Sequence, residues 1–320
     1  MAVSFMSENN SRRRFLKQSL LAAGALPLVS APFAATAQPS QLPKFHIFSK
    51  HLQFLNYADA ASVAAELGFD GVDWSVRPNG HVLPERVETD LPKAVEALKR
   101  AGLSPLLMTT AVGDSTDATD QRLLKTTAAL GFRYYRMNWY RYLPNQSMPE
   151  ALRMYEEKMI GLGKLNKELN LIGCYQNHAG ELVGASVWEL WQMLKNADLQ
   201  HTGVQYDIRH ATVEGGLSWK NGLRLLRPHI KTIVLKDFRW AKLNGRWAVE
   251  NTPIGEGMVD FTSYFKLLKQ YDLNVPVSVH LEYPLGGAEN GATSLSIDKK
   301  VVFEAMKRDL RKLKALWEAA

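Results

Sequence analysis

Short apolar runs alternate with longer amphipathic segments from residue 44 to the end of the chain. A run of four to eight apolar residues is typical of a buried strand, and apolar residues three or four positions apart are typical of a helix. Eight strands that each precede a helix predict a parallel sheet, closed as a single-domain (β/α)8 TIM barrel. The predicted strands lie within 45–49, 71–76, 105–112, 133–140, 171–178, 202–210, 230–238 and 275–283.

A doubly wound open sheet is the alternative fold. Such a sheet usually carries a glycine-rich phosphate-binding loop after its first strand. Residues 49–56 read SKHLQFLN and contain no glycine. The pattern therefore favours the barrel.

One insertion is predicted after the seventh strand. The segment RWAKLNGRWAVE places Asn244 and Gly245 between strand-like residues, and Asn-Gly is a strong signal for a β-hairpin. Trp240 and Trp247 lie on its two arms. Aromatic faces stack on sugar rings, so the hairpin is interpreted as a lid; the alternative is that both rings only pack it against the barrel rim.

The first 37 residues have a separate character. SRRRFLK (11–17) precedes an apolar run and the small-residue site Ala35-Thr36-Ala37, a pattern that resembles a twin-arginine export signal. We expect residues 1–37 to be a signal peptide, residues 38–320 to be the mature barrel, and the mature protein to be periplasmic or otherwise exported, without a stable membrane anchor. A permanent anchor is the weaker alternative, because alanine, glycine and proline dominate the run.

Charge and cysteine content narrow the class of partner. The net charge is +7, and removing the predicted signal lowers it to +4. No block of lysine and arginine gathers the surplus, so nucleic acid is not an expected partner. The single cysteine, Cys174, has no partner for an internal disulfide. A small molecule is the expected partner, and the sequence is compatible with a homo-oligomer.

Polar side chains gather where the predicted strands end. In a TIM barrel the residues at the carboxyl ends of the strands form the active site. Positions two apart on a strand share a face, so His280 lies one layer beneath Glu282. The candidates are Lys50, His51, Arg77, His81, Gln176, His178, Asp207, His210, Lys236, Asp237, His280 and Glu282.

Acids and imidazoles from strands five, six and eight suggest a metal site. His178, Asp207 and Glu282 are the predicted ligands of a divalent ion such as Mn, Zn, Co or Mg. An ion of this kind holds two neighbouring sugar oxygens and lowers the cost of charge on one of them.

Several segments together resemble the xylose isomerase-like TIM barrel family of sugar phosphate isomerases and epimerases. They are GFDGVDWSVRPNGHV, YDIRHA, IVLKDF, PIGEGMVDF and VHLEYPLGGAE, each at the expected strand end. The resemblance implies four metal ligands: glutamate, aspartate, histidine and glutamate on strands five to eight. Asp207 and Glu282 match the second and fourth, but Gln176 and Val234 stand where the family has glutamate and histidine.

This departure changes the implied mechanism. Epimerases of the family relay protons between two carboxylates, and Gln176 has no carboxylate to take part. One-sided proton abstraction remains, with Lys236 as the predicted base, His210 as a second catalytic group and Glu282 as the remaining carboxylate. We expect a sugar isomerase or epimerase-like enzyme, or a lyase or dehydratase acting on a keto-sugar or glycoside. A non-catalytic periplasmic sugar-binding barrel is the third hypothesis.

The remaining candidates are predicted to contact the substrate. They lie in the loops at the functional end of the barrel or, for Trp240, on the hairpin beside it. This set comprises Lys50, His51, Arg77, His81, Gln176 and Trp240.

Overall fold

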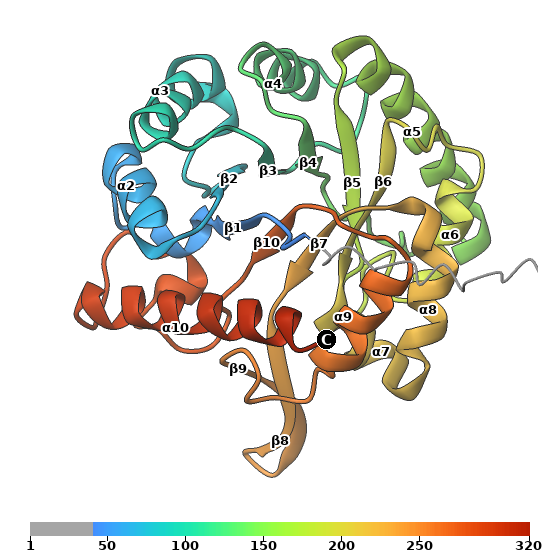
Figure 1. Cartoon of the computed structure of the whole chain (residues 1–320). Coiled ribbons are helices and arrows are strands. Elements are labelled where there is room, and N and C mark those ends of the chain that lie inside the picture. The colour runs from blue at the N-terminus through green and yellow to red at the C-terminus, as the bar shows by residue number, and fades with distance from the viewer. Residues whose placement is uncertain (1–40) are drawn as a thin grey trace, which may run out of the picture. The chain divides into compact units, whose positions relative to one another are not determined.

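Eight parallel strands close into a barrel in the computed structural model, which describes residues 41–320 (Figure 1). Around the barrel the strands follow the order β1-β10-β7-β6-β5-β4-β3-β2. The predicted (β/α)8 fold is confirmed, and the predicted signal peptide lies outside the described residues. The strands are β1 (Phe45–Phe48), β2 (Gly71–Val76), β3 (Leu107–Thr110), β4 (Tyr134–Arg136), β5 (Ile172–Gln176), β6 (Thr202–Asp207), β7 (Ile230–Leu235) and β10 (Val277–Val279).

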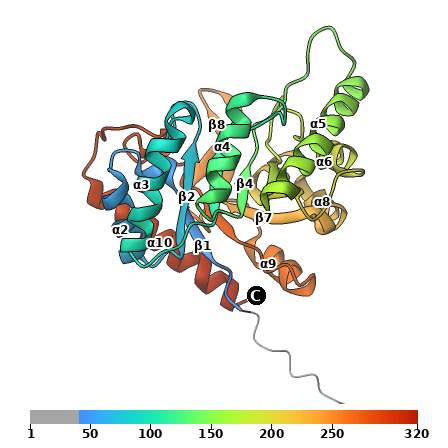
Figure 2. The same ribbon diagram turned by 90° about the horizontal axis from the view of Figure 1, so that it is seen from above.

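Helices surround the strands on the outside of the barrel (Figures 1 and 2). Their ends follow local chemistry: Asn56 caps α2 by accepting a hydrogen bond from the Asp59 backbone, and Gly68 ends it with a positive φ of 86°. The helices are α2 (Tyr57–Leu67), α3 (Val87–Arg100), α4 (Ala118–Ala129), α5 (Met148–Leu169), α6 (Val187–Leu194), α7 (Ile208–Gly215), α8 (Trp219–Leu226), α9 (Phe261–Gln270) and α10 (Lys299–Glu318). No helix among residues 41–320 is long and apolar enough to cross a bilayer.

Helix α7 differs from the prediction, which placed residues 208–210 in the sixth strand. It begins directly at the end of β6 because Asp207 acts as its N-cap, accepting a hydrogen bond from the His210 backbone N–H at 3.1 Å. The prediction from apolar spacing was wrong here because eight residues are too few to show helical periodicity. Asp207 consequently stands at a fixed junction between strand and helix.

The hairpin predicted after strand seven is present and extends away from the barrel (Figure 1). It consists of β8 (Asp237–Leu243) and β9 (Arg246–Thr252), antiparallel and joined by Asn244 and Gly245. Both turn residues have positive φ, 49° and 79°, as the tight hairpin turn requires. Since β8 starts at the residue after Lys236, the hairpin is anchored at the barrel mouth.

A buried polar layer lies inside the barrel beneath its mouth. Asp73 on β2 is fully buried and accepts hydrogen bonds from Thr109 Oγ1 at 3.1 Å and Ser278 Oγ at 2.6 Å. Burial raises the pKa of Asp73 to about 6 despite these bonds. Because its pKa is raised, Asp73 carries less than a full negative charge beneath the residues that line the mouth.

Candidate active site at the barrel mouth

A cavity of about 340 Å³ opens at the carboxyl ends of the strands. Nine of the residues that line it are charged side chains or histidines, and they come from opposite sides of the barrel. The lining residues are Phe48, Lys50, Arg77, Thr109, Arg136, Trp139, Gln176, His178, Arg209, His210, Lys236, Asn251, His280 and Glu282. TIM-barrel enzymes have their active sites at this end of the barrel, so the polar pocket is the candidate active site.

The centre of the site is one ammonium group between two carboxylates. Lys236 Nζ lies 3.2 Å from Asp207 Oδ2 and 3.9 Å from Glu282 Oε1. The side chains of Lys236 and Asp207 are buried, whereas 23% of the Glu282 side chain is exposed to the cavity. The ends of β6, β7 and β10 therefore meet at Lys236 Nζ, whereas the sequence predicted that the fifth, sixth and eighth barrel strands would meet at a metal ion.

Glu282 is surrounded by positive charge. Lys50 Nζ lies 3.1 Å from both of its carboxylate oxygens, and His280 Nδ1 lies 3.4 Å from Oε1. Burial alone would raise the pKa of Glu282, but Lys236, His280 and Lys50 together hold it well below its ordinary value. Glu282 is thus ionised at neutral pH.

His210 is a neutral hydrogen-bond donor in this arrangement. Burial, and after it the charge of Lys236, lowers the pKa of His210 well below its ordinary value. An Arg209 Nη1 donor lies 3.0 Å from His210 Nδ1, and since a guanidinium only donates, Nδ1 must accept. The ring proton is therefore on Nε2, which lies 3.5 Å from Asp207 Oδ2 without forming a hydrogen bond to it and has no other partner among residues 41–320.

His178 lies against His210, with ring centroids 4.0 Å apart, and its other neighbour is the ring of Trp139 at 4.6 Å. Burial lowers the pKa of His178 to about 4, with the charge of Lys236 as a second cause. Its Nδ1 is 2.9 Å from the Ala179 carbonyl oxygen, so this nitrogen carries the proton. The ring is neutral at neutral pH, so its Nε2 carries no proton.

The side chains do not fit the metal site that the family resemblance implies. Gln176 Nε2 donates to Asp207 Oδ2 at 2.9 Å. The family's glutamate at this position would put a second carboxylate beside Asp207, and two carboxylates this close would require a cation or a shared proton between them. The amide of Gln176 requires neither. On strand seven Val234 has no ligand atom, and the Lys236 ammonium lies between the two remaining acids.

The predicted ligands His178, Asp207 and Glu282 are therefore not brought together. No group of three or more histidine, cysteine, aspartate or glutamate side chains suited to an ion occurs in the described part of the chain. The sequence pattern placed all three at the mouth, but Lys236 and Gln176 fill the space between them.

Three of the predicted substrate contacts line the cavity and three do not. Lys50, Arg77 and Gln176 are in its wall. His51 is fully buried, with Nδ1 bonded to the Ala288 carbonyl and Nε2 to the Leu281 amide. Its ring therefore fixes backbone beneath the cavity.

His81 and Trp240 also lie outside the cavity wall. His81 Nε2 bonds to the Leu55 carbonyl at 2.9 Å, and its ring packs between Tyr57 and Trp74. Trp240 is 43% exposed on the hairpin and Trp247 is 71% exposed. Neither tryptophan is packed into the barrel rim, and the lid interpretation stays a prediction.

Several lining residues were not predicted. Asn251 comes from the base of the hairpin, near the end of β9: it accepts a hydrogen bond from Arg209 at 2.7 Å and donates one to the Glu282 carbonyl at 3.2 Å. Arg136 is the last residue of β4, and its guanidinium stacks on Trp139 at 4.0 Å. A lone arginine at the end of an aromatic strand was the available signal for Arg136.

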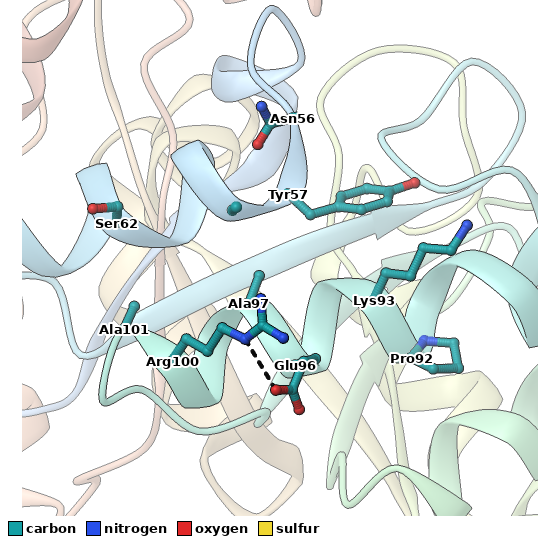
Figure 3. A pocket seen from close by; sticks show the side chains of 10 residues that line it. Asn56, Tyr57, Ser62, Pro92, Lys93, Glu96, Ala97, Arg100 and Ala101 are labelled. Carbon is teal, nitrogen blue, oxygen red and sulfur yellow. Dashed lines mark hydrogen bonds and ion pairs between the residues drawn. The ribbon is translucent and has the colours of Figure 1, made fainter.

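A second cavity of about 650 Å³ lies on the outer surface, between α2 and α3 (Figure 3). Its wall includes Tyr57, Pro92 and Ala97, and an Arg100–Glu96 ion pair of 3.1 Å crosses one side. The charged residues of this wall, Lys93, Glu96 and Arg100, are exposed on α3 and lie away from the carboxyl ends of the strands, where TIM barrels have their active sites.

Residues 61–298 match the family model described as "Xylose isomerase-like TIM barrel". The chain belongs to this family. The match spans the strands that supply Asp207, Lys236 and Glu282, and it confirms the resemblance noted in the sequence. No curated protein sequence matches the chain.

Solved structures share the fold at low sequence identity. A 3-keto-D-glucoside 4-epimerase from E. coli superposes with a TM-score of 0.63 at 15% identity, covering 86% of this chain and 100% of that one. A probable 3-DHS dehydratase from Bacillus anthracis gives 0.60 at 13% identity, covering 84% and 98%. A xylose isomerase-like TIM barrel protein from Mycobacterium smegmatis, in complex with magnesium, gives 0.62 at 11% identity, covering 88% and 99%.

Proposed function

We propose that this protein is an enzyme that removes a proton from the carbon next to the carbonyl of a keto-sugar or keto-glycoside, leading to isomerisation or elimination. The observation that carries the proposal is the position of Lys236 Nζ between Asp207 and Glu282 in a buried polar cavity. Similarity to an epimerase and a dehydratase with the same fold supports this reaction class.

Glu282 is the proposed base. Its carboxylate is ionised, faces the cavity and is held in place by Lys50. When it takes the proton, the electron pair of the broken C–H bond forms a carbon–carbon double bond and the carbonyl electrons move to oxygen. The protonated Glu282 then returns the proton to carbon, or gives it to a leaving hydroxyl or glycosidic oxygen.

Lys236 and His210 are the proposed groups that stabilise the charged oxygen. The Lys236 ammonium supplies a positive charge in a poorly solvated cavity, and His210 Nε2–H supplies a neutral donor beside it. The sequence suggested Lys236 as the base, but an ammonium held between two carboxylates is better placed to donate. The proposal routes no step through a divalent ion, since the donor set does not fit one.

The reaction is proposed to be one-sided. Gln176 lies where the family's second carboxylate would be, and its amide is fixed between Asp207 and Arg136, with Oε1 3.4 Å from Arg136 Nη1. An amide accepts no proton at neutral pH. Isomerisation and elimination need one base only, whereas epimerisation by two opposed bases does not fit.

Solvent exchange tests the proposal directly. The protein is incubated in deuterated water with a methyl 3-keto-glucoside and with D-fructose, and deuterium at carbon is followed by NMR. We expect label at one carbon next to the carbonyl, unchanged after dialysis against EDTA. Glu282→Gln should lower the exchange rate by about a thousandfold, since positioned bases contribute a hundred- to ten-thousandfold.

Glu304→Gln, on the exposed face of α10, is the matched control and should exchange at the wild-type rate. Absence of exchange with both probes would contradict the proposal and favour a binding protein. Exchange that EDTA abolishes and manganese or zinc restores would reject the metal-free assignment and retain the reaction.

A further inference from the structure

We propose that the opposite wall of the same cavity is an anion subsite, in which Arg77 and Arg136 bind a carboxylate, sulfate or phosphate group carried by the sugar. This inference deepens the proposed function and rests on it only in taking the cavity as the place where the sugar binds. One buried and one half-buried guanidinium group, neither of which forms an ion pair among residues 41–320, carry the argument.

Arg136 is the better fixed of the two arginines. It is 4% exposed, its Nη2 donates to the Thr110 carbonyl at 3.0 Å, and its Nη1 lies 3.4 Å from Gln176 Oε1. These partners are neutral, and Nε has no hydrogen-bond partner among residues 41–320. A buried guanidinium normally pairs with an acid, so one donor edge is left for a ligand.

Arg77 is held by still fewer contacts. Its guanidinium carbon lies 5.5 Å from the centre of the Phe48 ring, and no ion pair or side-chain hydrogen bond to it is found within residues 41–320. Burial, and after it the charge of Arg77, lowers the pKa of Arg136 to about 9. The two positive charges therefore repel one another, because little solvent lies between them to screen the interaction.

The acids of the cavity do not compensate this pair. Asp207 and Glu282 are already paired with Lys236 and Lys50. Asp73, beneath the mouth, is the acid with the largest electrostatic effect on the two arginines, but its oxygens accept hydrogen bonds from Thr109 and Ser278. The cavity wall thus carries five cationic side chains against the one carboxylate of Glu282: Lys50, Arg77, Arg136, Arg209 and Lys236.

The topology sets Arg136 across the barrel from Glu282 and Arg77 across from Asp207, while β1 alone separates β2 from β10. In the closed strand order, β2 faces β6 and β4 faces β10. Arg77 follows β2 and Arg136 ends β4, whereas Asp207 ends β6 and Glu282 follows β10. A sugar that spans the cavity would place its reacting carbon at Glu282 and its charged substituent at the two arginines.

Binding of matched sugars tests the subsite without turnover. D-glucuronate, D-glucose 6-sulfate, D-glucose 6-phosphate and neutral D-glucose are titrated by calorimetry at one ionic strength. We expect at least one charged sugar to bind about tenfold more tightly than glucose, and Arg77→Gln to remove that preference. The charged sugar that binds best identifies the anion.

Arg246→Gln removes the same charge from the exposed hairpin and should keep the preference. Arg77→Lys should recover part of it, because an ammonium keeps the charge but loses the planar fork. Equal binding of charged and neutral sugars, or no binding of the charged ones, would overturn the subsite. A preference lost equally in the Arg246 variant would also overturn it. Solvent exchange on the neutral keto-glycoside stays intact if only the subsite is wrong, and fails if the proposed reaction is wrong.

Discussion

The two halves of the barrel mouth differ in whether their charged side chains form ion pairs. On the side of β6, β7 and β10, the ammonium of Lys236 is close to both Asp207 and Glu282. On the side of β2 and β4, the guanidinium groups of Arg77 and Arg136 form no ion pair among the described residues, and the hydrogen-bond acceptors of Arg136 are neutral. Paired charges are held in place and can move protons, whereas buried unpaired charges reduce stability until a ligand supplies the partner.

The largest effect is expected where the charges are paired. Lys236→Met removes the ammonium and leaves the buried Asp207 beside Glu282 without a cation, which should lower the free energy of unfolding by about 3 kcal/mol. Urea denaturation measures the loss, and Lys242→Met on the exposed hairpin is the control. A loss below about 0.5 kcal/mol, the usual effect of a surface substitution, would show that these ion pairs do not stabilise the fold.

The same variant tests how the site handles a cation. With the ammonium gone, Asp207 and Glu282 can bind a divalent ion, so Lys236→Met should take up zinc or manganese when the wild type does not. Calorimetric titration of both proteins with each metal makes the comparison. Stoichiometric binding to the wild type would mean that Lys236 leaves the site readily, and would restore the metal-dependent hypothesis.

An effect of comparable size, summed over several buried groups, is expected from pH. Burial lowers the pKa values of His46, His178 and His280 to about 4, below the 6.5 of the unfolded chain. The unfolded state then binds more protons between these values, so stability present above pH 6.5 is lost as the pH falls toward 4. Each of these histidines should contribute a loss of about 1.4 kcal/mol per pH unit in that window.

Asp73 opposes this trend, because its raised pKa of about 6 means that the folded state keeps a proton the unfolded state releases. One such acid against three histidines leaves a net loss on acidification. Urea unfolding at pH 7.5, 6 and 5 measures the slope. Stability that is flat or rises toward pH 5 would contradict the neutral state of the histidines.

The smallest effect is expected where the charges are unpaired. Arg77→Gln removes a buried like charge from beside Arg136 and breaks no ion pair, so it should raise the free energy of unfolding by about 1 kcal/mol or less. Thermal unfolding without ligand measures the gain, with Arg246→Gln as the control. A clear decrease would show that Arg77 has a structural partner and would weaken the contrast between the two halves.

Most of the fold could be predicted because it depends on periodicity. Strand and helix spacing repeat eight times, and Asn244-Gly245 identifies the hairpin without tertiary information. Helix α7 was missed because its start depends on the cap formed by Asp207. Boundaries of this kind are set by single hydrogen bonds, which leave little trace in hydrophobic pattern.

The candidate site could be predicted in part. Alternation along strands located Asp207, Lys236 and Glu282 at the mouth, but it gives no information on how far a lysine side chain reaches. The position of Lys236 Nζ between the acids depends on that reach. Arg136 was missed because a single arginine at a strand end also fits a surface position, and only the closed barrel shows that it is buried.

The junction at Asp207 has a consequence for how the cavity works. One carboxylate oxygen holds the first turn of α7 while the other contacts Lys236 and Gln176, so the same group anchors backbone and site. Motion of this corner would require the helix to uncap. The reacting side of the cavity is therefore preformed, and recognition of substrate there should proceed by lock-and-key docking without induced fit.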